Sequence, residues 1–280
     1  MRKTYMKRQL LSLAILASLA GLATVQQAMA ASAPPVFSPT AEAAWVGIGI
    51  GAFAPIEGWP RPVGQDPAHR YVPNGTPNEQ PTQRISDISN PNLKQWAKDA
   101  MKKDNDEVLA GKFAFTARSS CIAAGVPGFL VLLGGALTIV QTPEKVTMIF
   151  DSNAEARHIP LNVPHAVNPK PSWYGDSVGH YEGDTLVVDT IGLNAKTFLD
   201  NYRTPHSEKL HVTERWRLIE DGKRIEVVLW IDDPDTFNAP FKMARQYERN
   251  DRDFMENICA ENNSANIFDY GTPTADKPDF

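Results

Sequence analysis

Charged side chains that stand in rows of apolar residues are the first feature of this sequence that could do chemistry. Glu214 lies between Val212 and Trp216, on the same side of an alternating segment. An isolated carboxylate is costly to bury, so Glu214 must pair with a cation, reach water or line a cavity. A carboxylate in a cavity is what a general acid or base uses. The other interpretation is half of a structural ion pair.

Two arginines occupy similar positions and are the candidate partners of Glu214. Arg157 lies two residues before Ile159, and Arg245 lies between Met243 and Tyr247. Either arginine, placed opposite Glu214 inside a barrel, would satisfy the buried carboxylate. With nearby aromatic residues they form the predicted substrate-binding set, which is Arg157, Arg245, Trp173, Trp216 and Tyr247.

Histidines in loops are the second group of candidates. His206 precedes the segment that carries Glu214, and His165 follows Pro164. Loops on a rigid scaffold often carry functional groups. Asp189 ends a Leu-Val-Val-Asp run, where it either lies at a barrel mouth or accepts hydrogen bonds from residues 194–197. The predicted catalytic residues are Glu214, His206, Asp189 and His165.

The spacing of His206, Glu208 and His211 resembles a metal motif only superficially. The helical zinc motif needs its histidines four apart on one helix face, whereas these are five apart and lead into a strand. We therefore predict no metal, although this cluster leaves that alternative open. For His158, His180 and His211 we expect surface or hydrogen-bonded roles. The sequence contains no phosphate loop, dinucleotide fingerprint or haem motif, so no cofactor is predicted.

Residues 1–30 have the pattern of a secretory signal peptide. Basic residues precede an uncharged apolar run over 10–25, and Ala28-Met29-Ala30 is a small-x-small cleavage site. The run is shorter than the ~20 apolar residues of a membrane-spanning helix. We expect cleavage rather than a retained anchor, no integral membrane segment afterwards, and a periplasmic or secreted protein.

The charge balance is acidic and bears on the choice of partner. The 280-residue chain has a formal charge of −5, and loss of the four basic residues of the signal would make it −9. No basic stripe with interleaved aromatic residues is present, so nucleic acid is not an expected partner. The expected partner is a small molecule, and the sequence does not indicate an oligomeric state.

The two cysteines, Cys121 and Cys259, are predicted to form a disulfide. In an oxidising compartment a lone pair of cysteines usually bridges. Such a bond would tie the beginning of the β-rich region to its end, which favours one domain. A reactive thiol and a metal ligand remain as alternatives, but neither cysteine lies in a C-x-x-C motif.

The chain divides into a signal peptide (1–30), a proline-rich arm (31–90) and a β domain (91–280). Trp45, Phe53 and Trp59 are too apolar for a disordered tail, so we expect parts of the arm to lie against the domain. A helix is predicted from Pro91 to about Leu109, capped by Asn90. Residues 122–142 contain proline and several glycines, which indicate a loop and a buried strand.

From about residue 145 the apolar residues recur with a period of two. Strands are expected over 145–151, 157–161, 177–181, 185–191, 210–218, 225–231 and 241–247. Tight turns at 182–184 and 221–222 join two pairs of them. The predicted fold is therefore all-β: an antiparallel up-and-down meander that forms a lipocalin-like barrel or a half-open sheet, with the proline-rich arm and one short helix.

Three motifs carry a resemblance to a known group of proteins. They are the long segment 171–217, which begins PSWYGDSVGHYEGDTLVVDT, then IDDP at 231–234 and CAENN at 259–263. Together they resemble a large family of bacterial secreted β-rich proteins, most of which have no assigned function. The resemblance implies a compact exported β domain and no particular chemistry.

Two hypotheses about function follow from these residues. In the first, the protein is an exported, cofactor-independent enzyme that performs acid/base chemistry of the hydro-lyase or isomerase type. Its substrate would be a small, largely apolar or aromatic molecule in a barrel cavity. In the second, it is a lipocalin-like periplasmic binding protein in which Glu214 and an arginine orient a ligand. The number of titratable groups favours the enzyme.

Overall fold

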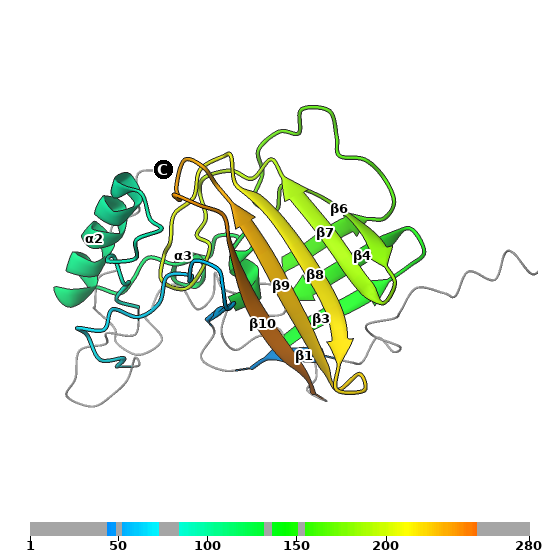
Figure 1. Ribbon diagram of the computed structural model, residues 1–280, viewed down its shortest axis with the longest axis horizontal. Helices are drawn as coiled ribbons and strands as arrows, with labels where there is room; N and C mark the ends of the chain where they lie inside the picture. The colour runs from blue at the N-terminus through cyan, green and yellow to red at the C-terminus, as the bar shows by residue number, and fades with distance from the viewer. Residues whose placement is uncertain (1–43, 49–51, 73–83, 132–135, 151–154, 251–280) are drawn as a thin grey trace, which may run out of the picture. The chain divides into compact units, whose positions relative to one another are not determined.

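The computed structural model of the chain describes residues 44–48, 52–72, 84–131, 136–150 and 155–250 (Figure 1). The expected signal peptide and Cys259 lie outside these ranges, so signal cleavage and the disulfide stay predictions. The CAENN motif at 259–263 lies outside them as well. All structural statements below concern the described residues.

In the described part of the chain ten strands form one sheet, and its strands are antiparallel, as the sequence predicts. They are β1 (Ala44–Gly47), β2 (Ala54–Pro55), β3 (Ala136–Gln141), β4 (Lys145–Phe150), β5 (Glu155–Pro160), β6 (Asp176–Glu182), β7 (Thr185–Ile191), β8 (His211–Ile219), β9 (Arg224–Asp232) and β10 (Phe241–Asn250). The order across the sheet is β5-β4-β3-β1-β10-β9-β8-β7-β6, and β2 pairs with β10. Figure 1 shows β10, β9, β8 and β7 side by side, so these four strands can carry one continuous surface.

Two tight turns occur where the sequence predicts them. Glu182 pairs with Thr185, which leaves Gly183 and Asp184 as the turn between β6 and β7. At the turn between β8 and β9, Gly222 has a φ of 79°. That left-handed conformation favours glycine, because other residues have a Cβ that clashes with the backbone.

Strand β1 joins the two ends of the meander. It pairs with β3 on one side and with β10 on the other. Trp45 in this strand is only 1 % exposed, and Phe53 just after it is also buried. A short segment that the sequence assigns to the arm therefore contributes both backbone pairing and core packing.

The sheet curls until its two edge strands meet at one point. Leu161, just after β5, bridges Gly179 of β6, and the Asn162 N–H donates to the Gly179 carbonyl at 2.7 Å. A Cβ on Gly179 would lie 3.0 Å from Ile159 and 3.1 Å from Leu161, so glycine permits this close approach. The strand order still ends at β5 and β6. Of the two expected forms, the structure has the half-open sheet.

The predicted start of the helix is wrong by four residues. Helix α2 spans Gln95–Leu109 and not Pro91 to Leu109. Leu93 instead forms a β-bridge with Phe237, and the Lys94 N–H donates to the Thr236 carbonyl, which keeps this backbone extended. Asn90 accepts a hydrogen bond from the Asn92 N–H, so its side chain closes a turn rather than capping the helix.

Two shorter helical segments precede β3. Helix α3 spans Ala117–Ser120 and the 3-10 helix η1 spans Gly128–Val131. The buried strand expected within 122–142 is β3, and η1 lies in the loop before it. In the described part of the chain, no helix combines the length and the apolar character needed to cross a membrane.

Candidate functional site

Glu214 lies in the interior, as its row of apolar neighbours predicts. Its carboxylate is completely buried and faces Arg157, which is 1 % exposed at the side chain. The Arg157 Nη1 donates to both carboxylate oxygens, at 2.8 and 3.0 Å. The Trp216 indole N–H donates to the same carboxylate at 3.2 Å. Of the two candidate partners of Glu214, Arg157 is the one that pairs with it.

Arg157 also links strands on both sides of the open edge. From β5 its Nη2 donates to Thr190 of β7 at 2.8 Å and to Ser177 of β6 at 3.1 Å. Glu214 belongs to β8, so the guanidinium of Arg157 on β5 contacts three strands at the other end of the sheet, β6, β7 and β8. Because every contact is buried and hydrogen-bonded, this geometry favours the structural interpretation of the pair.

The other residues of the predicted substrate-binding set pack in different ways. Arg245 does not face Glu214: its Nη1 donates to the carbonyls of Ile48 and Ala52, at 2.5 and 3.3 Å. Tyr247 donates its hydroxyl to the Leu130 carbonyl and stacks on Trp216 with ring centroids 6.2 Å apart. Three of the five, Trp216, Tyr247 and Arg157, are at most 2 % exposed, whereas Trp173 is partly exposed.

His206 is buried and fixes a loop. Its Nδ1 lies 3.0 Å from the Ser207 carbonyl, so this nitrogen carries the proton and donates it. Its Nε2 lies 2.7 Å from the Thr197 hydroxyl, which then donates to it. Burial lowers the pKa of His206, which keeps the ring neutral. Neither Glu214 nor Asp189 is among its hydrogen-bond partners.

The remaining two predicted catalytic residues, Asp189 and His165, contact each other. The His165 Nε2 lies 2.9 Å from Asp189 Oδ2, and the His165 Nδ1 lies 2.8 Å from Asp176 Oδ2. Asp189 Oδ1 accepts from His211 Nε2 at 2.7 Å and from the Thr213 hydroxyl at 2.9 Å. We call this group, His165, Asp176, Asp189, His211 and Thr213, the outer cluster.

Three neighbouring strands and one loop position the outer cluster. Along β7, Val188 and Thr190 point inward and are fully buried, so Asp189 between them points to the opposite face. Asp189 pairs with Thr213 of β8 across the sheet. Asp176 begins β6, and His165 comes from the loop between β5 and β6. The side chains of the four ionisable members are between 23 and 36 % exposed.

Hydrogen bonds set the charges of the outer cluster. Partial burial acts to raise the pKa of Asp189, but donation from His211 and His165 outweighs it and holds that pKa well below its usual range. The bond to Asp189 raises the pKa of His211. For His165, burial acts to lower the pKa, and the bonds to Asp189 and Asp176 raise it overall. The cluster is thus an alternating chain of carboxylates and histidines.

The two histidines differ in what they can still do. Both nitrogens of His165 face carboxylates, so its ring is held as an imidazolium. His211 gives only Nε2 to Asp189, and no described residue forms a hydrogen bond with its Nδ1. Its ring packs edge-on against Trp230, with centroids 5.6 Å apart. His211 Nδ1 is therefore the atom of the cluster that can exchange a proton with a bound molecule.

The sequence predicts part of this group. It singles out Asp189 and His165 as catalytic residues and expects a surface or hydrogen-bonded His211, which the bond to Asp189 confirms, but it does not single out Asp176. The alternative in which residues 194–197 bind Asp189 is wrong, because its donors are His165, His211 and Thr213. The alternation of side chains along the strand was the available signal. Val212 and Glu214 point inward, so His211 and Thr213, which alternate with them, point to the outer face.

The metal alternative does not match the geometry. His206 faces Thr197, His211 faces Asp189, and Glu208 is exposed, so these three residues do not converge. Across the described ranges, no three His, Cys, Asp or Glu side chains are grouped so that they could hold a metal ion.

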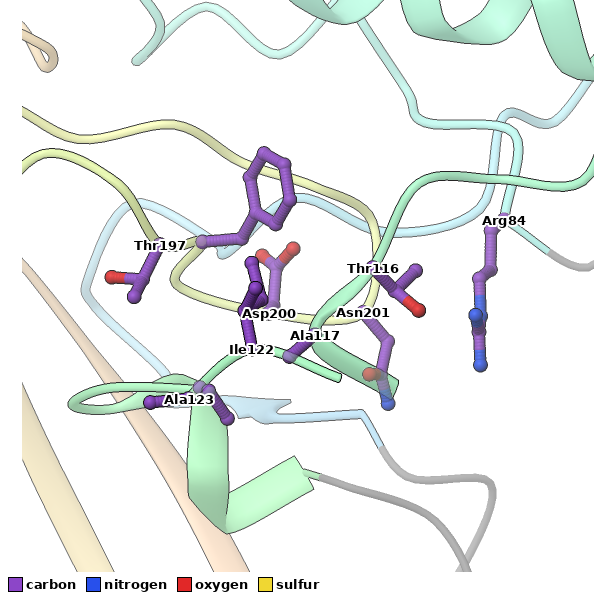
Figure 2. A pocket seen from close by; sticks show the side chains of 11 residues that line it. Arg84, Thr116, Ala117, Ile122, Ala123, Thr197, Asp200 and Asn201 are labelled. Atoms are coloured by element: carbon purple, nitrogen blue, oxygen red, sulfur yellow. The ribbon is translucent and has the colours of Figure 1, made fainter. Parts of the chain in front are cut away.

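A separate hollow lies between the loop after β7 and the segment around α3 (Figure 2). Its cavity volume is about 30 Å³. Asp200 lies within it, and Figure 2 shows the Thr197 hydroxyl turned away from Asp200. The lining residues are Arg84, Thr116, Ala117, Ile122, Ala123, Ala124, Gly128, Thr197, Phe198, Asp200 and Asn201.

Asp200 should make stability fall as the pH rises. Burial raises its pKa to about 6, despite hydrogen bonds from Thr204 and the Tyr202 N–H. A carboxyl with a raised folded-state pKa stabilises most below its unfolded pKa of about 3.9, and loses that contribution as the pH passes the folded value. The free energy of unfolding of Asp200→Asn, measured with urea and taken relative to wild type, should therefore rise by about 2 kcal/mol from pH 4 to pH 7.

The control for this comparison is Asp184→Asn, which changes a carboxylate in an exposed turn. Its stability relative to wild type should hardly vary over the same pH range. A constant difference between wild type and Asp200→Asn would contradict the raised pKa.

Comparison with known proteins adds no function to this geometry: no family model matches the sequence, and no curated protein matches it either. The resemblance carried by segments 171–217 and 231–234 therefore stays a prediction.

Proposed function

We propose that this protein is an exported, cofactor-independent enzyme in which His211 moves protons on a small, largely apolar or aromatic molecule. The reaction would be of the hydro-lyase or isomerase type. One observation carries the proposal: Asp189 lies 2.7 Å from His211 Nε2, while Nδ1 of the same ring has no hydrogen-bond partner among the described residues. A histidine oriented by a carboxylate is a common form of general acid or base.

The surroundings of the outer cluster suit an apolar substrate. Two valines of the loop that carries His165 are unusually exposed, Val163 at 46 % and Val167 at 91 %. Trp230 adds an aromatic ring directly beside His211. Together these side chains give the face around the outer cluster exposed apolar surface, which an apolar substrate would cover on binding.

The proton transfer is simple to write. Neutral His211 takes a proton at Nδ1 from the carbon next to a carbonyl or carboxyl group, and that C–H electron pair moves into the substrate. Asp189 stabilises the resulting imidazolium through Nε2–H. The proton then returns to another atom of the substrate in an isomerisation, or to a leaving hydroxyl in a dehydration. His165 is a positioning residue, because it holds Asp189 and not the substrate.

The alternative binding protein has less support in this geometry. A ligand oriented by Glu214 would occupy the interior, where Trp216 and Tyr247 stack and Arg157 fills the space beside Glu214. Nothing comparable to the unpartnered His211 Nδ1 favours that hypothesis.

Deuterium exchange tests the proposal without knowledge of the natural substrate. Phenylpyruvate and its methyl ester have benzylic protons next to a ketone, and proton NMR in D2O follows their loss. The protein should accelerate exchange for at least one probe, and the acceleration should disappear in His211→Gln. Equal rates with wild type and with His211→Gln, for both probes, would refute the assignment.

A further inference from the structure

A row of side chains extends from the outer cluster across the next two strands. Thr213 of β8 pairs with Trp230 of β9, and Trp230 pairs with Lys242 of β10. Directly opposed residues of neighbouring strands lie on the same face of a sheet. Beyond Lys242, the turn after β2 supplies Trp59, whose ring centroid lies 4.5 Å from the Lys242 Nζ. At ~4.8 Å per strand, the row covers roughly 10 Å from Thr213 to Lys242.

Lys242 has no carboxylate partner in the part of the chain that the structure describes, unlike the nearby cations Lys209 and Arg217. Among the described residues, no Asp or Glu lies within ion-pair distance of its Nζ, although the chain has more acidic than basic residues. Lys209 pairs with Asp235 at 3.0 Å, and Arg217 pairs with Glu226 at 2.6 Å. Lys242 instead contacts the face of Trp59, which holds the ammonium in place without neutralising it.

We propose that this row binds the substrate of His211 and that the substrate is a small aromatic carboxylate. The carboxylate pairs with Lys242, and the aromatic part of the molecule extends across Trp230 towards His211. The chemistry assigned to His211 rests on the proposed function, whereas the binding does not depend on it.

Two features select this class of ligand. The row offers indole rings at Trp230 and Trp59, whose faces suit a flat aromatic molecule better than a flexible aliphatic one. Lys242, the only cation in the row, has no counter-ion among the described residues, so an anionic ligand would supply the missing ion-pair partner. A hydrogen bond to a charged group contributes about 1.5–3 kcal/mol, which corresponds to roughly tenfold or more in affinity.

Benzoate binding tests the row directly. We expect isothermal titration calorimetry to detect benzoate binding to the full chain, and to detect weaker binding of benzamide and of cyclohexanecarboxylate. Lys242→Gln should weaken benzoate binding by roughly tenfold. The matched control is Lys209→Gln, which removes the same charge from a lysine that has its own carboxylate partner and should leave benzoate affinity unchanged.

The outcomes separate this inference from the proposed function. If wild type does not bind benzoate, or if Lys242→Gln binds it as tightly as wild type, the aromatic carboxylate is wrong. Deuterium exchange of the methyl ester that depends on His211 would then still support the catalytic role. Suppose that wild type exchanges phenylpyruvate faster than its ester. If the ratio of these two rates then falls roughly tenfold in Lys242→Gln, both the catalytic role of His211 and the carboxylate site at Lys242 are supported. If benzoate binds but no exchange depends on His211, the row is supported as a binding site and the catalytic role of His211 is refuted.

Discussion

Glu214→Gln should lower the free energy of unfolding by about 3–5 kcal/mol, because it leaves the Arg157 guanidinium buried without its counter-ion. The two side chains are 0 and 1 % exposed, so water cannot replace the lost carboxylate charge. Urea unfolding monitored by tryptophan fluorescence measures the change. The folded fraction should keep the benzoate affinity of wild type, since the pair lies on the opposite face of the sheet from the outer cluster.

Two further variants make this result specific. Replacing both partners, with Arg157→Met and Glu214→Leu, should recover most of the loss, because no unpaired charge remains; Trp216 still loses one hydrogen bond, at about 1–2 kcal/mol. Glu226→Gln removes one partner of the half-exposed Arg217 pair and should cost less than about 1 kcal/mol. A stable Glu214→Gln variant that loses activity would instead restore a catalytic role for Glu214.

His211→Gln should reduce the rate of deuterium exchange by about 10²–10⁴, the usual contribution of one general acid or base. Glutamine can still donate to Asp189, but it cannot accept and release a proton near neutral pH. The rate is measured by proton NMR with the same probe at fixed pH, after circular dichroism has established that the variant is folded.

His180→Gln provides the control for general effects of removing a histidine. His180 is exposed, and its Nε2 lies 3.2 Å from Glu182 and is not bonded to Asp189. It should keep the wild-type rate. Comparable losses in both variants would contradict a special role for His211.

The alternation of apolar residues makes most of the sheet predictable. Strands β4 to β10 follow from period-two segments, and Gly183 and Gly222 mark two of the turns between them. Strand β1 is different, because only four residues among prolines and glycines form it. Its position depends on the backbone groups of β3 and β10 that pair with it, and both of these strands are far away in the sequence.

Buried charges are predictable as a class, but their partners are not. The rows that contain Glu214, Arg157 and Arg245 predict that all three are buried, and they are at most 6 % exposed. The choice between the two arginines depends on how far the sheet curls. That curl brings β5 against β6 and so places Arg157, not Arg245, at Glu214.

The outer cluster is harder to predict for a similar reason. The connection between β7 and β8 is long, so no tight turn fixes the pairing of Asp189 with Thr213. His165 reaches Asp189 only because its loop folds over β6 and β7, where Asp176 also binds it. Loop conformations of this kind depend on tertiary contacts that local sequence patterns do not encode.

The pKa of His211 tests the central claim most directly, because it needs no substrate. In protein labelled with 13C and 15N at histidine, NMR titration should give His211 a pKa above the ordinary value of about 6.5 in wild type. Asp189→Asn removes the carboxylate that raises it, so the His211 pKa should fall in this variant. A wild-type His211 pKa at or below about 6.5, or one that Asp189→Asn leaves unchanged, would contradict the account.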